Sequence, residues 1–361
     1  MKKRVLLITV CLLASTLMVS ALAAGSFDDS LVSLSYLTEV FTKSVDQKVE
    51  EKLDASDALL SGGTAGSAPA VAKTWTETRL KSQDVLLGTT GTSVMVLAGN
   101  LQVSFPSGTV VDVTTGSTVA SGTALAAKHR YMVAEDTSAL FQVTSKTAVV
   151  DYQGSYSFSY SDAVDYNAIA TALKTLHLFR GSDTGYGQGY DLEVAPTRIQ
   201  ALIMFIRVLG EENEALAYTG SHPFTDIVKG SQSDKYVGYA YAKGYTNGYS
   251  PTTFEPNLTI PANQYVEFVL RAMGYSSTSG SPVSTSLERA LDCGVLTEGE
   301  YSLLKTGTFL RADLAYISYY ALDTQMAQGG QCLRDALLER GTFTAAEARE
   351  ADRLVSSVRI S

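Results

Sequence analysis

The spacing of apolar residues changes along this 361-residue chain and divides it into segments. Between residues 27 and 60, apolar side chains recur every three or four positions, as at Leu34, Leu37 and Phe41. That spacing puts them on one face of a helix, so it predicts an amphipathic helix over 27–60. Such a helix could dock on its own domain or form a short coiled coil, and the lack of clean heptads favours docking.

The following residues, 61–73, are mostly Gly, Ser and Ala and predict a flexible linker, because little in them can bury or lock the backbone. From 74 to 160 the apolar period becomes two, as in 101–105 and 141–143, and glycines separate the runs. This pattern predicts an all-β sandwich or barrel. The β-domain could be a display module or could bind a protein or glycan, but no cluster of side chains in it indicates a ligand.

The C-terminal half has a helical period and an internal repeat. Three apolar stripes align in register, which predicts three units at 165–220 (unit 1), 221–278 (unit 2) and 281–323 (unit 3). The matching positions are Leu202, Ile206 and Leu209 in unit 1, Val266, Leu270 and Met273 in unit 2, and Ala315, Tyr319 and Leu322 in unit 3. Equivalent stripes can bury one another around a common axis. A helical tail at 326–361 is expected to pack on unit 3. The predicted fold class is thus multidomain α+β.

The first residues are typical of an export signal. Three basic residues at 2–4 precede a short apolar run at 5–19 and the small-x-small sequence Ala21-Leu22-Ala23. This order predicts a cleaved signal peptide at 1–23. An uncleaved anchor is the alternative, but the run is shorter than the ~20 residues that span a bilayer. No later segment is expected to cross a membrane, so the mature protein should be secreted to the cell wall or surface.

Composition agrees with export and argues against nucleic acid as a partner. Lys and Arg number 28 against 37 Asp and Glu, giving a formal net charge of −9. A protein with this charge has no diffuse attraction to phosphate backbones. Charged residues make up 18% of the chain, below the roughly 25% of an average domain. The uncharged, hydroxyl-rich surface that this implies is typical of exported bacterial proteins.

Residues that carry catalytic or metal chemistry are scarce. Cys11 leaves with the signal, and Cys293 and Cys332 could form a bridge but fit free thiols better. The histidines match no zinc pattern, so neither a metal nor another cofactor is expected. Residues 185–189 are glycine-rich but lack the strand and the lysine of a phosphate loop. The sequence favours a non-enzyme, with a wall hydrolase as a minor alternative, because a pair of carboxylates can act without a motif.

Unit 2 carries an ordered set of short motifs. Its pieces are Phe-Thr-Asp at 224–226, an aromatic and glycine-rich run at 236–248, and Thr-Phe-Glu-Pro-Asn at 253–257. This order resembles the F-x-D, A-x-x-x-G-y-x-d-G and t-F-x-P-n elements of the S-layer homology family, cell-wall-binding modules of bacterial surface proteins. Unit 1 is similar at 178–186 and 195–198, and unit 3 at 293–296 and 308–313. The resemblance covers residues 165–323, less than half of the chain.

The resemblance implies a fold and a ligand. Family members form a pseudo-threefold arrangement with a central helix bundle and grooves between repeats, and they bind a secondary cell-wall polysaccharide that often carries pyruvate ketals. Their helix begins with T-R-A-E, and here Thr197 with Gln200 fits a capping box that would fix Arg198. An arginine at a helix start offers paired donors and a favourable dipole to a carboxylate.

The three units are not equivalent at the arginine position. Arg198 in unit 1 and Arg311 in unit 3 occupy it, whereas unit 2 has Ala262. Unit 3 also replaces the capping threonine with Leu310 and has no clear F-x-D element. The resemblance therefore assigns anion binding to Arg198 and Arg311 and puts the groove at Ala262 in doubt.

Three further residues match groove positions of the family. Asp226 would accept hydrogen bonds from sugar hydroxyls, and Gly244 and Gly248 would let a sugar approach the backbone. Each has a purely structural alternative: Asp226 could cap a helix, the glycines could serve turns, and Arg198 could pair with a neighbouring acid. The predicted function is noncovalent attachment to the cell wall, and the competing interpretation is a structural or interaction protein whose degenerate repeats bind no glycan.

Overall fold

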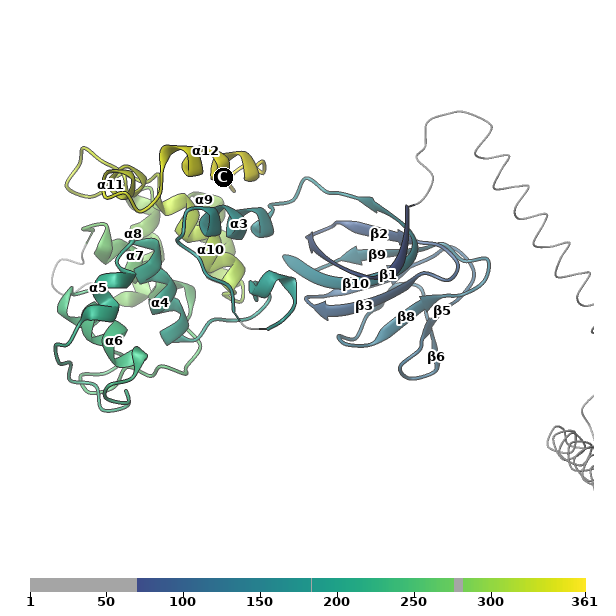
Figure 1. The fold of residues 1–361 in the computed structure, drawn as a ribbon, viewed down its shortest axis with the longest axis horizontal. Helices are drawn as coiled ribbons and strands as arrows, with labels where there is room; N and C mark the ends of the chain where they lie inside the picture. The colour runs from purple at the N-terminus through teal and green to yellow at the C-terminus, as the bar shows by residue number, and fades with distance from the viewer. Residues whose placement is uncertain (1–69, 183, 276–281) are drawn as a thin grey trace, which may run out of the picture. The chain divides into compact units, whose positions relative to one another are not determined.

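The computed structural model describes residues 70–182, 184–275 and 282–361, all of which lie in the second of two units of the chain, 69–361. Strands come first in the chain and helices follow, as the sequence predicts (Figure 1).

Three expectations concern residues outside these ranges. They are the signal peptide at 1–23, the amphipathic helix at 27–60 and most of the linker at 61–73. The end of the expected linker is described, and it is strand from Ala70 onward.

The strands form one ten-stranded antiparallel sheet that curves like a barrel. Along the sheet the order is β6-β5-β8-β3-β10-β2-β9-β4-β7, and β1 pairs with β10. The strands are β1 (Ala70–Lys81), β2 (Val85–Gly88), β3 (Ser93–Ala98), β4 (Leu101–Ser104), β5 (Val110–Asp112), β6 (Ser117–Val119), β7 (Thr123–Ala124), β8 (Arg130–Val133), β9 (Ala139–Val143) and β10 (Thr147–Ser159). The long strand β10 pairs with β1, β2 and β3 and so joins the two arms of the sheet.

The period of two in the sequence separates the faces of this sheet. In β9, Ala139, Phe141 and Val143 are buried while Leu140 and Gln142 are exposed. The buried faces form a core of their own, distinct from that of the helices. Because alternate side chains of a strand point to opposite faces, this alternation is what makes the sheet close over an apolar interior. The predicted all-β domain is confirmed.

The rest of the described chain is helical. The α-helices are α3 (Tyr166–Thr175), α4 (Arg198–Val208), α5 (Glu212–Ala217), α6 (Gln232–Ala242), α7 (Ala262–Ala272), α8 (Ser286–Asp292), α9 (Glu298–Thr306), α10 (Arg311–Ala321), α11 (Leu333–Glu339) and α12 (Ala345–Leu354). Two short 3₁₀ turns, η2 (Gly187–Gly189) and η3 (Val283–Thr285), lie in the connections.

Helices α4, α7 and α10 are the inner helices, and each contacts the other two. They carry the three apolar stripes that align in the sequence, and Leu202, Leu270 and Leu322 from those stripes are fully buried. A buried hydrogen bond of 2.6 Å also joins the hydroxyl oxygens of Tyr265 in α7 and Ser318 in α10. Burial of the shared stripe therefore builds the centre of the helical region.

Each inner helix receives an outer helix from a neighbouring unit. Helix α6 of unit 2 packs on α4 of unit 1, α8 of unit 3 packs on α7 of unit 2, and α3 of unit 1 packs on α10 of unit 3. The same neighbour relation thus recurs three times, and each unit depends on another to cover its apolar surface.

The C-terminal tail contacts more of the molecule than the sequence indicates. It reaches unit 3, where the backbone N–H of Ile360 donates to the Tyr316 hydroxyl at 2.8 Å. Helix α12, however, packs on α3 of unit 1. The expectation that the tail packs on unit 3 was incomplete, because an apolar stripe shows that a helix needs a partner without showing which helix supplies it.

Candidate functional site

The candidate site begins at the N-terminus of α4, where the sequence fixes the start of the helix. The Thr197 backbone N–H donates to Gln200 Oε1 at 3.0 Å, and the Gln200 N–H donates to the Thr197 hydroxyl at 3.4 Å. The predicted capping box is confirmed. It places Arg198 at the first helical position.

Arg198 is almost fully buried and is held by polar groups without charge. Its Nε donates to the backbone oxygen of Phe254 at 2.8 Å, and its Nη1 donates to Gln264 Oε1. The guanidinium lies 4.9 Å from the ring centre of Phe254 and 5.6 Å from that of Tyr249. Among the described residues, no carboxylate forms an ion pair with Arg198 and no acceptor bonds to its Nη2. The alternative of a neighbouring acid as its partner is therefore not what the structure shows.

The buried guanidinium carries an electrostatic cost that an anion would relieve. Burial lowers the pKa of Arg198, against the opposing influence of Tyr249, Glu255 and Asp226. A desolvated cation without a paired anion is unfavourable, so a ligand carboxylate that reached it would gain a strong, charge-assisted contact.

A hollow of about 270 Å³ opens beside Arg198. Its lining includes Arg198, Asn247, Gly248, Tyr249, Gln264 and Arg271. The structure thus brings two of the predicted residues together at one concave surface, Arg198 and Gly248. Polar and aromatic groups converging on such a surface are the usual composition of a small-ligand site.

Sequence reasoning missed most residues of this hollow, and two of them, Tyr249 and Arg271, bear directly on its chemistry. Tyr249, 57% exposed, follows Gly248 and offers its ring to the hollow, a position that the motif itself could have indicated. Arg271 lies in the last turn of α7, where the aligned position of α4 has Arg207. Its Nε donates to Glu267 at 2.7 Å, so this second cation of the wall is already paired.

Asp226 holds a loop and does not line the hollow. Its carboxylate accepts from the backbone N–H of Phe254 at 2.9 Å and from that of Glu255 at 2.7 Å. It thereby fixes residues 254–258, the unit 2 loop, against Arg198. The structural alternative for Asp226 was that it caps a helix, whereas its carboxylate binds backbone N–H groups of a loop.

The two candidate glycines have different roles. Gly244, at φ +74°, ends α6, and His177 and Gly294 adopt the same left-handed conformation after α3 and α8. Since a histidine serves there in unit 1, this position terminates a helix and does not require the absence of a side chain. Gly248 does require it, because a Cβ would lie 2.3 Å from the Phe224 ring. Gly248 lines the hollow and Gly244 does not.

Arg311 lies at a separate, analogous position at the start of α10. Its Nε donates to the backbone oxygen of Tyr190 at 3.2 Å, and its guanidinium is 5.9 Å from the ring centre of Phe179. Burial lowers the pKa of Arg311; Asp191 and Glu193 oppose this shift, whereas the positive charge of Arg207 adds to it. The structure does not bring Arg198 and Arg311 into one site.

Both arginine helices are fastened in the same way by the loop of a neighbouring unit. In α4, the backbone N–H groups of Arg198 and Ile199 donate to oxygens of the unit 2 loop at 2.9 and 3.1 Å. In α10, those of Arg311 and Ala312 donate at 2.9 and 3.0 Å to residues 187–194, the unit 1 loop. Helix α9 takes the place of the corresponding loop in unit 3, and no described loop oxygen accepts from Ala262 at the start of α7.

Other candidate chemistry is sparse within 70–182, 184–275 and 282–361. Cys293 and Cys332 are free and half-buried. These ranges hold no group of three or more His, Cys, Asp or Glu residues able to bind a metal ion. No helix in them combines the length and apolarity that crossing a bilayer requires.

Comparisons with known proteins bear on unit 2 first. Residues 223–260 match the S-layer homology domain family. A protein of Thermoanaerobacter kivui named "Cell surface protein" is 26% identical over 210 residues, which are 56% of this chain and 27% of that protein. The chain therefore spans little more than a quarter of the length of this relative.

Two solved seed proteins show weak structural likeness. Recombinant pro-11S globulin of pumpkin is 15% identical with a TM-score of 0.16, covering 28% of each chain. Procruciferin, an 11S globulin from Brassica napus, is 11% identical with a TM-score of 0.17, covering 28% of this chain and 27% of that one. TM-scores this low do not indicate a shared fold, so the family assignment rests on the match at 223–260. This chain contains a segment of the S-layer homology type, and the resemblance found in its sequence is confirmed there.

Proposed function

We propose that this protein attaches noncovalently to the bacterial cell wall by binding an acidic secondary cell-wall polysaccharide in the hollow beside α4. The observation that carries this proposal is the guanidinium of Arg198, which is buried, has no carboxylate partner among the described residues and borders a concave surface. The S-layer homology segment and the name of the relative support attachment at the surface.

The chemistry of the hollow suits a carboxylated sugar. A pyruvate ketal of the kind that the family resemblance implies would accept from the free nitrogen of Arg198. The exposed ring of Tyr249 offers an apolar face for the sugar, and Asn247 offers a side-chain amide. A chain of net charge −9 can bind an acidic polymer in this way because recognition is local.

The rest of the molecule fits this role. The recurring contacts between units support a pseudo-threefold arrangement, with a second anion site at Arg311 and none at Ala262. The β-domain would be displayed at the cell surface and would have a protein or glycan partner of its own. Export by the signal sequence at 1–23 would deliver the chain to the wall.

Sedimentation with isolated cell walls tests the proposal. The parent protein should pellet with walls that carry their secondary polymer and stay in solution once the polymer is stripped. Tyr249→Ala should weaken pelleting about tenfold, because it removes the exposed aromatic wall of the hollow and little buried surface. Tyr241→Ala is the matched control, since Tyr241 is 40% exposed and lies outside the hollow.

Two results would contradict the proposal. A parent that stays in solution with polymer-bearing walls would favour the alternative, in which the repeats only support the β-domain. Release of sugars or wall peptides during the incubation would point instead to a hydrolase, whereas we propose a protein without catalytic activity. Equal pelleting of parent and Tyr249→Ala would leave attachment in place and remove the hollow as its site.

A further inference from the structure

The unit 1 and unit 2 loops accept hydrogen bonds from the N-termini of α10 and α4 in the same way. The two loops differ in the residues that hold them in place. The unit 2 loop is held from within its own unit by the carboxylate of Asp226. Among the described residues, no carboxylate accepts from the corresponding N–H groups of Tyr190 and Asp191 in the unit 1 loop. That loop is held by Ser182 of its own unit, which bonds to Gly189 and Asp191, and by strands β1 and β10 of the β-domain.

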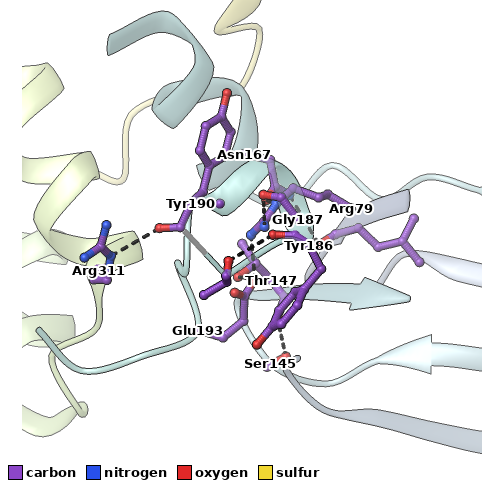
Figure 2. A network of polar contacts seen from close by, with 12 residues as sticks. Arg79, Ser145, Thr147, Asn167, Tyr186, Gly187, Tyr190, Glu193 and Arg311 are labelled. Atoms are coloured by element: carbon purple, nitrogen blue, oxygen red, sulfur yellow. Dashed lines mark hydrogen bonds and ion pairs between the residues drawn. The ribbon is translucent and has the colours of Figure 1, made fainter. Parts of the chain in front are cut away.

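Arg79 in β1 makes two of these contacts and also bonds to α3 (Figure 2). Its guanidinium donates to the backbone oxygen of Gly187 at 2.8 Å, to Asn167 Oδ1 at 2.7 Å and to Glu193 Oε1 at 2.6 Å. Glu77, two residues earlier in β1, accepts from the Gly187 N–H at 2.8 Å. One strand of the β-domain thus holds both the N–H and the C=O of Gly187.

Glu193 connects this network to Arg311. The side chains of Arg79 and Glu193 are only 8% and 7% exposed, so their ion pair is largely screened from water. Thr147 of β10 also donates to Glu193 Oε1, at 2.7 Å, whereas Glu193 Oε2 is buried without a hydrogen-bond partner in the described structure. Burial lowers the pKa of Arg311, and the carboxylates of Asp191 and Glu193 oppose this shift. The Nε of Arg311 is held by Tyr190, three residues from Glu193 in the same loop.

We propose that Arg79 of the β-domain is a positioning residue of the second anion site: it fixes the unit 1 loop and neutralises Glu193, which leaves Arg311 available to an anionic ligand. This inference rests on the proposed function. Without Arg79, the buried carboxylate of Glu193 has Arg311 as a remaining cation to pair with, and a ligand carboxylate must compete with it. The β-domain is therefore part of the wall-binding machinery as well as its cargo.

The test follows each arginine separately in the full chain. Nuclear magnetic resonance of ¹⁵N-arginine-labelled protein resolves Nε–H groups that are held in hydrogen bonds, as those of Arg198 and Arg311 are. The probe is a methyl glycoside that carries a pyruvate ketal. In the parent, both resonances should shift during the titration.

Arg79→Met should weaken the response of Arg311 about tenfold and leave that of Arg198 unchanged. The retained response of Arg198 shows that the helical region of the variant is folded. Arg79→Met combined with Glu193→Gln should restore the response of Arg311, because the charge that competes with the ligand is gone. Arg79→Lys should keep most of the response.

Lys146→Met is the matched control. In the described part of the chain, Lys146 forms the other ion pair between the β-domain and the helical region, at 2.5 Å from the buried Asp313, and its loss leaves Arg79 and Glu193 intact. The response of Arg311 should stay within about twofold of the parent, because Asp313 keeps its hydrogen bond from the Leu310 N–H and is not among the charges that shift the pKa of Arg311. An equal loss in Lys146→Met and Arg79→Met would assign the effect to general loosening and would overturn the role of Arg79.

The remaining outcomes separate this inference from the proposed function. An unchanged response of Arg311 in Arg79→Met, or a parent in which Arg198 responds and Arg311 does not, overturns the inference and leaves the proposed function standing. A parent in which neither arginine responds overturns the proposed function and the inference with it.

Discussion

Two of the three inner helices begin with an arginine and the third begins with an alanine. Arg198 and Arg311 meet a loop from a neighbouring unit, and each donates both its backbone N–H and its Nε to oxygens of that loop. Ala262 meets no such loop in the described structure, because α9 takes its place in unit 3. The arginine is therefore present where there is a loop to hold.

This difference shows that the arginine of the motif has a structural role, in addition to the anion binding that we propose for it. Arg198 fastens two units with its Nε and Nη1, and Arg311 does so with its Nε. No described acceptor bonds to Nη2 of Arg198. Unit 3 is fastened to α7 in another way. Glu267 of α7 accepts from the Ser286 hydroxyl at 2.7 Å and from the Arg289 guanidinium, both in α8. The boundaries of unit 2 with units 1 and 3 are thus each secured by a buried charge, Arg198 and Glu267.

The largest effect on stability is expected at Glu267, which joins α7 to α8. Glu267→Ala should lower the free energy of unfolding by about 3–5 kcal/mol, because it leaves Arg271 and Arg289 without their buried counter-charge. Urea denaturation followed by circular dichroism measures it. Glu339→Ala, at an exposed acid in α11, is the control and should change stability by less than about 0.5 kcal/mol. Similar values for the two variants would show that α7 is not fastened through Glu267.

A smaller loss is expected at the arginine helices. Arg198→Met keeps the apolar stem but leaves Phe254 O and Gln264 without their donor, so it should cost about 2–3 kcal/mol. Arg311→Met should cost about 1–2 kcal/mol, since its Nε contact is longer, at 3.2 Å, and its side chain is less buried. The same denaturation experiment applies, with the exposed Arg349→Met as control. If Arg198→Met is as stable as Arg349→Met, the fastening role of the arginine is wrong.

The smallest effect on stability is expected at the C-terminal end of α4, where Arg207 pairs with Glu212. Burial raises the pKa of Glu212, but hydrogen bonds from Tyr236 and Arg207 outweigh burial and hold that pKa below its usual 4.5. The folded state therefore releases this proton more readily than the unfolded state. The resulting stability is present above about pH 4.5 and is lost as the pH falls further.

Glu212→Gln should accordingly cost about 1 kcal/mol at pH 7 and less in acid. Free energies of unfolding measured between pH 7 and 3.5 should decline less steeply for this variant than for the parent. Parallel declines would show that the ion pair of Arg207 contributes nothing to the acid sensitivity.

The sequence predicted which segments are strands and helices better than it predicted which of them contact one another. The change from a period of two to a helical period separated strands from helices, because burial of one face imposes that period directly. Thr197 and Gln200 predicted their cap because both partners lie within one turn. The contact of α12 with α3 could not be predicted, since an amphipathic helix of the right length fits several apolar surfaces equally well.

The candidate site was predicted in part for the same reason. Arg198 and Gly248 were found from local motifs, and Tyr249 could have been found beside Gly248. Asp226 was found, but its partners are backbone N–H groups of a loop, which a motif does not show. Arg79 gave no signal at all, because it lies in a strand far from unit 1 in the sequence and acts only once the two parts are in contact.

The contact between α12 and α3 has a consequence for how the chain folds. The two helices come from opposite ends of the helical region, and the backbone N–H of Ile360 adds a further attachment to Tyr316. Bringing such distant segments together is entropically costly, so it slows folding. As the chain leaves the ribosome, these contacts cannot form until α12 and the residues around Ile360 have emerged. A polypeptide that stays open this long is compatible with threading through a narrow protein-conducting channel before it folds.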